Sequence, residues 1–433
     1  MLKRLRQLHQ HYWKIAVSTV VQYFGKALQI VLSVVTIKLI ASNLDQGDYG
    51  VYSAISEYAL FFSTAANLGL FAHIVRAVSV AKTDKQVMVN ALFLRLVSAL
   101  LIFVAGLLYL KVAGVEERFF YGSVLFFGAL LLDYLTSVCN AWLQANYRMA
   151  QATFALLFGK IASVVLTGVV LSVDGLSLAW YFLPTVVGSL LSFVITFWLV
   201  RYHLHGRWSL NWQLWRDLLV SSIPFGLISL ANSIYFRFLP DYVAHDMLTS
   251  QQFATFSLIM RVTQVAALLS TFLMFSALPV LRQAIVKGAW EEVRTIYRRL
   301  MKVLIGVGVA LLVFGTLFSS TLLHVVANAK YNRPELWFVW PLLLLLAALS
   351  YGYDLVLITL FAHEQERWWL KIELQALLCA AFVYLVITYS PASGLRTVFL
   401  ELVAACVLEG YMVWRGHRAL QKLWRREAPA ELV

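Results

Sequence analysis

The stretch MVNALFLRLVSALLIFVAGLLYL occupies residues 88–110 and contains a single charged residue, Arg95. Its 23 residues are enough for a helix to cross a bilayer core of about 30 Å, which takes roughly 20 residues. Comparable stretches occupy residues 15–40, 49–75, 119–145, 150–173, 176–200, 218–240, 251–281, 303–326, 336–362, 368–389 and 397–414. The sequence therefore predicts an all-α polytopic membrane protein with about twelve transmembrane helices.

Lys and Arg residues are distributed unequally between alternate connections of these helices. The side that holds the N terminus carries 24 of them, whereas the opposite side carries five: Lys111, Arg118, Lys330, Arg333 and Arg396. Basic residues near short connections stay on the cytoplasmic side. We therefore expect a multi-pass protein of the bacterial inner membrane with both termini in the cytoplasm.

The composition excludes an ordinary soluble domain, because 61% of the residues are hydrophobic and the mean hydropathy is +0.76. The net charge of +13 suits attraction to anionic lipid at the cytoplasmic surface. Because no nucleic-acid-binding module is visible in the sequence, we expect no nucleic-acid partner. The cysteines, Cys139, Cys379 and Cys406, lie in apolar stretches without metal-ligand spacing. The sequence therefore predicts neither a metal nor another cofactor.

The chain divides into two halves of six predicted crossings each, residues 1–200 and 218–433. Between them, residues 201–217 carry Trp208, Trp212 and Trp215 at helical spacing, which predicts a cytoplasmic amphipathic linker in the membrane interface. Shifted by 204 residues, NLDQGDYGVYSAI (43–55) aligns weakly with MLTSQQFATFSLI (247–259). Repeats with an even number of crossings run parallel, which predicts two pseudo-symmetric six-helix bundles around a central cavity.

Charged side chains inside the predicted crossings mark helix faces that avoid lipid. Lys26 and Lys160 lie about 15 Å from a membrane face, and a charge at a helix centre costs about 2.5–3.5 kcal/mol. We expect them and Arg261 to face a hydrated cavity; the alternative is an interhelical ion pair with Glu57 or Asp133.

Two further arginines and several amides complete the polar faces. Arg95 and Arg237 are equally consistent with lining the cavity and with reaching an interface. The amides that could bind a polar substrate are Gln22, Gln29, Asn140, Gln144 and Gln264. Pro184, Pro224, Pro240 and Pro279 permit kinks, which could serve gating or only packing.

Several segments resemble a known family. They are KLIASNLDQGDYGVYSAI (38–55), NLGLFAHIVRAVS (67–79) and LQANYRMAQATFALLFGKIASVVL (143–166). With the basic N-terminal tail and the topology, they are similar to the Wzx-type O-antigen and capsular-repeat flippases. These flippases are polysaccharide exporters of the multidrug/oligosaccharidyl-lipid/polysaccharide exporter (MOP) superfamily, and they serve lipopolysaccharide and capsule assembly.

The resemblance implies alternating access by two helix bundles around a cationic lumen. The substrate would be an undecaprenyl-diphosphate-linked oligosaccharide, and the cationic role would fall to Lys26, Arg95, Lys160 and Arg261. A diphosphate needs cations and a sugar needs amides, whereas the lipid tail can stay in the bilayer. Expected partners are the lipid-linked oligosaccharide, membrane lipids, the polysaccharide polymerase and the chain-length regulator. No Walker A motif is present, so energy would come from an ion gradient or from removal of product. For ion coupling, the candidates are Glu57 and Asp133.

Two other functions are open at this point. A cation-coupled multidrug antiporter of the same superfamily would want a buried carboxylate in the first helix, where this chain has Lys26. A membrane-embedded polysaccharide polymerase or ligase would need a large outer loop with catalytic residues. The predicted outer connections are about ten residues or fewer, so we expect a transporter and not an enzyme.

Overall fold

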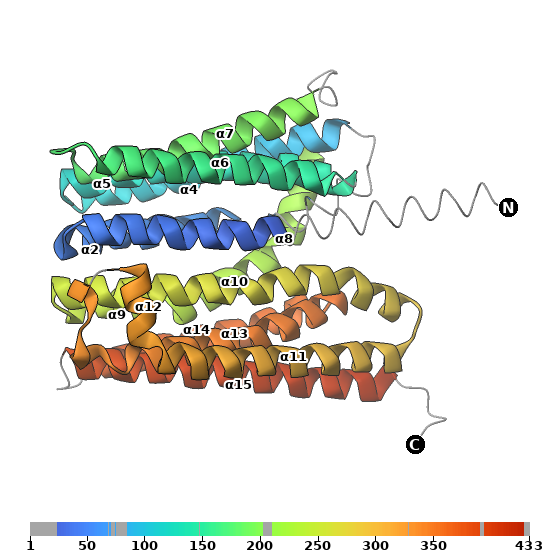
Figure 1. The fold of residues 1–433 in the computed structure, drawn as a ribbon. Helices are drawn as coiled ribbons and strands as arrows, with labels where there is room; N and C mark the ends of the chain where they lie inside the picture. Colours follow the sequence, from blue (N-terminus) through green and yellow to red (C-terminus); the bar gives the residue numbers. More distant parts are fainter. Residues whose placement is uncertain are drawn as a thin grey trace. The chain divides into compact units, whose positions relative to one another are not determined.

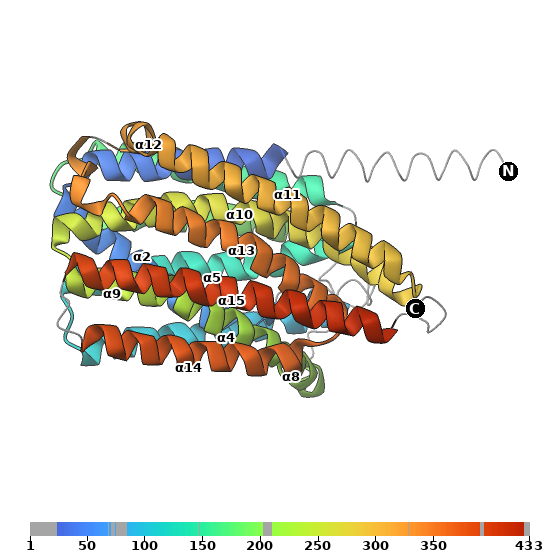
Figure 2. The ribbon, with the colours of Figure 1, turned by 90° about the horizontal axis from the view of Figure 1, so that it is seen from below.

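The protein is described from a computed structural model, which describes residues 24–67, 69–70, 74, 85–146, 148–201, 210–327, 329–389 and 394–427. These residues are mainly helical and contain no β-strand. Long helices run side by side within each part of the chain (Figures 1 and 2). The prediction of an all-α polytopic membrane protein is confirmed.

The helices in the first half are Phe24–Asn43, α2 (Gln46–Asn67), α4 (Lys85–Val112), α5 (Glu117–Ala145), α6 (Met149–Leu171), η1 (Leu178–Phe182) and α7 (Leu183–Val200). Those in the second half are α8 (Trp212–Ser233), η3 (Ile234–Phe238), α9 (Leu239–Met247), α10 (Ser250–Val286), α11 (Trp290–Leu317), α12 (Ser319–Val326), η4 (Ala329–Tyr331), η5 (Pro334–Leu336), α13 (Val339–Ala362), α14 (Glu366–Thr388) and α15 (Leu395–Glu427). Among the described residues, ten helical segments are long and apolar enough to cross a membrane. Helices α2 and α10 coincide with the predicted second and eighth crossings.

Large apolar side chains point outward from these helices. Leu101 and Leu108 of α4 are exposed, as are Val165 of α6 and Val309 of α11. In water such surfaces would drive association, whereas lipid tails solvate them. The surface thus suits a membrane environment.

The chain forms two compact units. The N-terminal unit comprises Met1–Leu44 and Ala54–Ser229, and the C-terminal unit comprises Asp45–Ser53 and Leu230–Val433. These units are defined by contacts, whereas the division into 1–200, 201–217 and 218–433 was inferred from topology. That division stays a prediction.

In the N-terminal unit, α5 packs against α4 and α7, and α6 packs against α7. The contact between α6 and α7 is close because glycines meet there. A Cβ atom on Gly159 would lie 2.3 Å from the carbonyl oxygen of Gly188 and 2.0 Å from Oγ of Ser192. Small residues let two membrane helices approach in this way.

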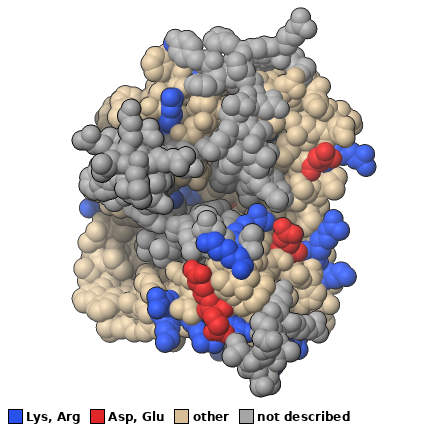
Figure 3. Space-filling view, turned by 90° about the vertical axis from the view of Figure 1, so that its right-hand side faces the viewer, with Lys and Arg blue, Asp and Glu red and all other residues tan. Residues whose placement is uncertain are grey.

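In the C-terminal unit, α13 packs against α10, α11 and α15 (Figure 2). Aromatic side chains connect the beginning of α11 with the ends of α13 and α15 through ring stacking and a hydrogen bond. Trp290 stacks on His363, whose Nε2 accepts a hydrogen bond from Nε1 of Trp424 at 3.2 Å. Figure 3 looks onto the end of the helices at which α11 begins, and Lys and Arg side chains gather on that face.

Two amphipathic segments continue into membrane helices. The pattern of EEVRTIYRRL (291–300) predicts an amphipathic cytoplasmic helix, and in the structure this stretch is continuous with the ninth crossing in α11. Of the predicted linker, residues 202–209 lie outside the described residues, and Trp212 begins α8. Asn90 of α4 holds this end, since its Oδ1 accepts from the backbone N–H of Asn211 at 2.7 Å and from Nε1 of Trp215 at 3.0 Å.

The seventh crossing is irregular where its second proline lies. Helices α8 and α9 are joined without a break by the π-helical turn η3, which ends one residue before Leu239 and two before Pro240. Proline has no N–H for the helix and its ring crowds the preceding turn. A wider turn before Pro240 relieves that crowding.

Candidate functional site

Arg95 of α4 is the most buried basic residue among the described ones, with an exposed fraction of 1%. Its guanidinium donates to the carbonyl oxygen of Asn67 at 3.2 Å and to Oδ1 of Asn67 at 2.8 Å. It also lies over the ring of Tyr134, 4.6 Å from the centroid. No carboxylate among the described residues forms an ion pair with it. Its contacts are therefore neutral acceptors and a π face.

Lys160 of α6 lies close enough to Asp133 of α5 for an electrostatic interaction. Asp133 also shares a side-chain hydrogen bond with Ser189 of α7. Lys160 is half-buried and Asp133 is exposed, although both lie near the middle of their helices. The structure thus brings together two of the predicted residues on three neighbouring helices.

The other predicted residues of the N-terminal unit are more scattered. Gln22 lies outside the described residues, whereas Lys26, Gln29, Asn140 and Gln144 are half-buried. The helix Phe24–Asn43 approaches α6 at Gly25, where a Cβ atom would lie 2.0 Å from Cγ2 of Thr153. The buried Oδ1 of Asn140 has no hydrogen-bond partner among the described residues. Glu57 of α2 is 5% exposed.

In the C-terminal unit, Arg261 of α10 contacts the first residues of α2. Its Nε donates to Oγ of Ser53 at 2.9 Å, and its guanidinium lies 5.3 Å from the centroid of Tyr52. Gln264, one turn further along, is half-buried, and its buried Nε2 has no hydrogen-bond partner in the described part of the chain. Arg237 lies in η3, with its guanidinium 5.6 Å from the ring centroid of Phe238. As contacts to a substrate, all these residues stay predictions.

A cluster of buried acids in the C-terminal unit was missed from the sequence. Glu373 of α14 and Glu409 of α15 are both 0% exposed. Glu373 accepts hydrogen bonds from the hydroxyl groups of Tyr235 and Tyr353, and Glu409 accepts one from Nδ2 of Asn232. Both glutamates lie inside predicted crossings, so the insertion cost that singled out the basic residues would have singled them out too.

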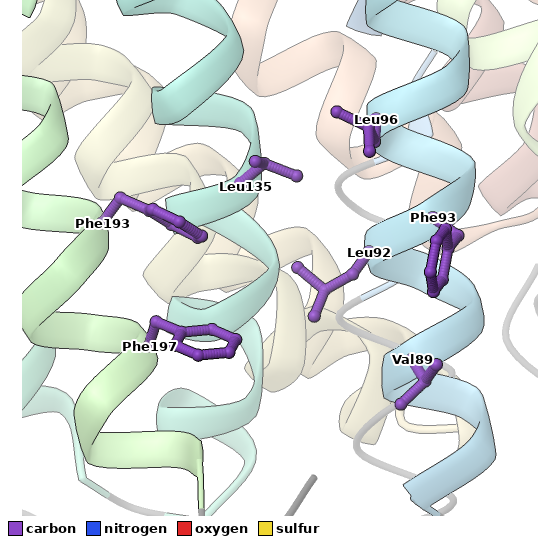
Figure 4. Close-up of a pocket in the computed structure, with 7 residues that line it drawn as sticks. All are labelled: Val89, Leu92, Phe93, Leu96, Leu135, Phe193 and Phe197. Atoms are coloured by element: carbon purple, nitrogen blue, oxygen red, sulfur yellow. The ribbon is translucent and has the colours of Figure 1, made fainter. Parts of the chain in front are cut away.

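A groove between α4, α5 and α7 of the N-terminal unit has a wholly apolar lining. It has a volume of about 120 Å³ and is lined by Val89, Leu92, Phe93, Leu96, Leu135, Phe193 and Phe197. Figure 4 shows the side chains of α4 on one side and Phe193 and Phe197 of α7 on the other. Such a lining can hold an apolar chain but cannot bind a charged group.

The arrangement of the described residues can therefore bind a polar ligand. Its polar groups are cations, amides and protonatable acids inside long membrane helices. A family model described as "Polysaccharide biosynthesis protein" matches residues 13–285 of this chain. The chain belongs to the polysaccharide biosynthesis protein family. No curated protein matches it.

Solved structures show the fold to which this family member is similar. An inward-facing multidrug resistance MATE family transporter of the MOP superfamily has a TM-score of 0.70 at 15% identity, over 95% of this chain and 99% of that one. A MOP superfamily transporter from Pyrococcus furiosus has the same score and identity, over 95% and 96%. A Vibrio cholerae MATE transporter scores 0.69 at 16% identity, over 96% and 97%. The chain thus combines membership of this family with the fold of these transporters, and its long apolar helices indicate a multi-pass membrane protein.

Proposed function

We propose that the protein is a flippase that moves an undecaprenyl-diphosphate-linked oligosaccharide repeat unit from the cytoplasmic to the periplasmic leaflet of the bacterial inner membrane by alternating access. The observation that carries the proposal is a set of basic side chains inside the membrane helices of a polysaccharide biosynthesis family member: Lys26, Arg95 and Lys160. A diphosphate crossing the bilayer core needs such cations, because a low dielectric strengthens their attraction and water is scarce.

Lys160 is the best placed of these residues. It is half-buried near the middle of α6, and its partner Asp133 is exposed, so a phosphate can approach both without breaking the core. A phosphate that replaces Asp133 as the partner of Lys160 would bind the transported group directly. Asp133 would then hold the lysine in place while no substrate is present.

The competing multidrug antiporter makes a different prediction for a deletion strain. Loss of a flippase should leave lipid-linked repeats on the cytoplasmic leaflet and abolish surface polysaccharide, with drug resistance unchanged. Normal surface polymer in a deletion strain that has no second flippase would overturn the proposal. Reduced drug resistance with normal polymer would favour the antiporter.

Complementing that strain tests Lys160. We expect Lys160→Ala to reduce export about tenfold or more, because a charge-assisted hydrogen bond contributes about 1.5–3 kcal/mol, while Lys160→Arg retains part of the activity. Lys371→Ala, which removes an exposed lysine of α14, is the matched control and should export normally. If Lys160→Ala instead lowers membrane abundance and added Asp133→Asn restores it, the pair is structural.

A further inference from the structure

Glu373 and Glu409 lie in a closed polar cluster formed by five elements of the C-terminal unit. Oε2 of Glu373 accepts from the hydroxyl group of Tyr235 at 3.1 Å, and Oε1 accepts from the hydroxyl group of Tyr353. Nδ2 of Asn232 donates to the Tyr235 hydroxyl oxygen at 2.9 Å and to Oε2 of Glu409 at 3.4 Å. The two carboxyl groups are thus connected through Asn232 and Tyr235.

The charges around Glu409 are of one sign. The ionisable groups that face it are Cys406 on its own helix, Asp354 and Tyr353 on α13, Glu373 on α14 and Tyr235 on η3. No Lys, Arg or His among the described residues forms an ion pair with Glu373 or Glu409. Two carboxylates that are fully buried and close together cannot both be ionised without a compensating cation. One proton must therefore be bound to the pair.

The hydrogen bonds show which carboxyl group holds that proton. Glu373 accepts from two phenol hydroxyl groups, which stabilises a carboxylate. Among the described residues, Glu409 accepts a single long hydrogen bond, and its buried Oε1 has no partner there. Oε1 of Glu409 is therefore the atom that the proton occupies.

A metal ion is a weaker explanation for the cluster. Among the described residues, no group of three or more His, Cys, Asp or Glu side chains is arranged to hold a metal. Both oxygens of Glu373 already accept hydroxyl protons, which a coordinated cation would displace.

We propose that Glu373 and Glu409 form a proton-binding site, and that loss of the proton from Glu409 changes the conformation of the π-helical turn Ile234–Phe238. Release converts the Glu409 carboxylic acid to a carboxylate and passes one proton to water. The new negative charge repels Glu373 and competes for the N–H of Asn232 and the O–H of Tyr235. Those donors lie at the end of α8 and in η3, where a widened helical turn can change its register at low cost.

The use of this site in transport rests on the proposed function, whereas proton binding itself does not. The test is therefore spectroscopic. In purified, reconstituted full-length protein, infrared difference spectra should show one carboxylic acid carbonyl band that is lost as the pH rises. Glu409→Gln, which keeps size and fold, should lack that loss, whereas Glu373→Gln should shift it to lower pH because the repelling carboxylate is gone. Glu401→Gln should retain it, since Glu401 is a buried acid of the same helix outside the cluster.

Two outcomes would overturn the site. One is a band that titrates unchanged in both Glu409→Gln and Glu373→Gln. The other is a band lost at constant pH when sodium chloride replaces choline chloride, which would assign the cluster to a metal cation. Neither outcome depends on transport of the substrate, so refuting the proton-binding site would leave the proposed function untouched.

Hydrogen exchange tests the coupled turn. After correction for the intrinsic dependence on pH, amides of Ile234–Phe238 should exchange several-fold faster above the titration of the band than below it. In Glu409→Gln they should stay at the slow rate throughout. Unchanged protection of this turn in the unaltered protein across the titration would contradict the conformational step.

Discussion

Arg95 carries a positive charge inside a membrane helix, and no carboxylate among the described residues forms an ion pair with it. Asn67 offers its guanidinium two oxygens and Tyr134 offers a ring face. Because the planar guanidinium donates to two oxygens at once, its shape matters here as well as its charge.

We expect Arg95→Lys to destabilise the protein by about 1–3 kcal/mol, the cost of a buried acceptor left without its donor. Membrane abundance and the melting temperature in detergent are the measurements. Arg118→Lys is the control, because the Arg118 side chain is 44% exposed. Equal behaviour of the two variants would mean that the contacts of Arg95 do not depend on the guanidinium shape.

The sequence indicated which residues of the candidate site carry buried charge, but not their partners. Arg95 and Lys160 stand out in apolar stretches, since a charge there is costly. The partners are distant in sequence: Asn67 lies 28 residues from Arg95, and Glu373 lies 138 residues from Tyr235. Periodicity places residues on a helix face and says nothing about which face of another helix it meets.

At the scale of helices, the contact between α6 and α7 depends on the absence of side chains at Gly159 and Gly188. The hydroxyl group of Ser192 also donates to the carbonyl oxygen of Ala155 across this contact at 3.3 Å. On α6, Ala155 lies about one turn from Gly159, and on α7, Ser192 lies about one turn from Gly188. One added methyl group therefore has to displace backbone.

Gly159→Ala should lower stability by about 1–3 kcal/mol through overpacking. Gly168→Ala on the same helix is the matched control, because no heavy atom lies within 4 Å of a Cβ there and alanine favours the helix by about 1 kcal/mol. Thermal unfolding in detergent compares them. A melting temperature of Gly159→Ala at or above that of the unaltered protein would refute the close contact.

The ends of α11, α13 and α15 should respond to acid through His363. Burial lowers the pKa of His363 from 6.5 to about 4, and its Nε2 must be unprotonated to accept from Trp424. The unfolded chain binds the proton more readily, so the contribution of His363 is complete above about pH 6.5 and is lost as the pH falls towards 4.

We expect the melting temperature to fall by roughly 2–4 °C between neutral pH and pH 5 on account of this residue. His363→Gln, which cannot take up a proton, should show a smaller fall over the same range. An identical fall in both proteins would locate the acid response elsewhere.

The helices were largely predictable, because a run of apolar residues long enough to cross the bilayer leaves the backbone few alternatives to a helix. Their ends and irregularities were less so. The amphipathic start of α11 continues the crossing, since nothing between Trp290 and Leu317 breaks the helix. The π-helical turn before Pro240 depends on local crowding, and the pattern of apolar residues does not record it.

For the whole molecule, the unequal distribution of basic residues predicts which ends of the helices face the cytoplasm. In a background without the native cysteines, a thiol reagent that cannot cross membranes should label Asp174→Cys in intact cells. It should label Arg298→Cys only after the membrane is opened; both side chains are exposed. Labelling of Arg298→Cys in intact cells would reverse the predicted orientation.

The short segment Asp45–Ser53 belongs to the C-terminal unit, although it precedes most of the N-terminal unit in the chain. Gln46 accepts a hydrogen bond from Arg333, 287 residues later, and Ser53 accepts one from Arg261, 208 residues later. During synthesis, these contacts can form only after the second half of the chain has entered the membrane. Gln46 and Ser53 therefore lack these two native contacts at a stage when the helices of the N-terminal unit are already complete. A ribosome that stalls after the N-terminal helices would leave Gln46 and Ser53 without these contacts and exposed to quality-control proteases.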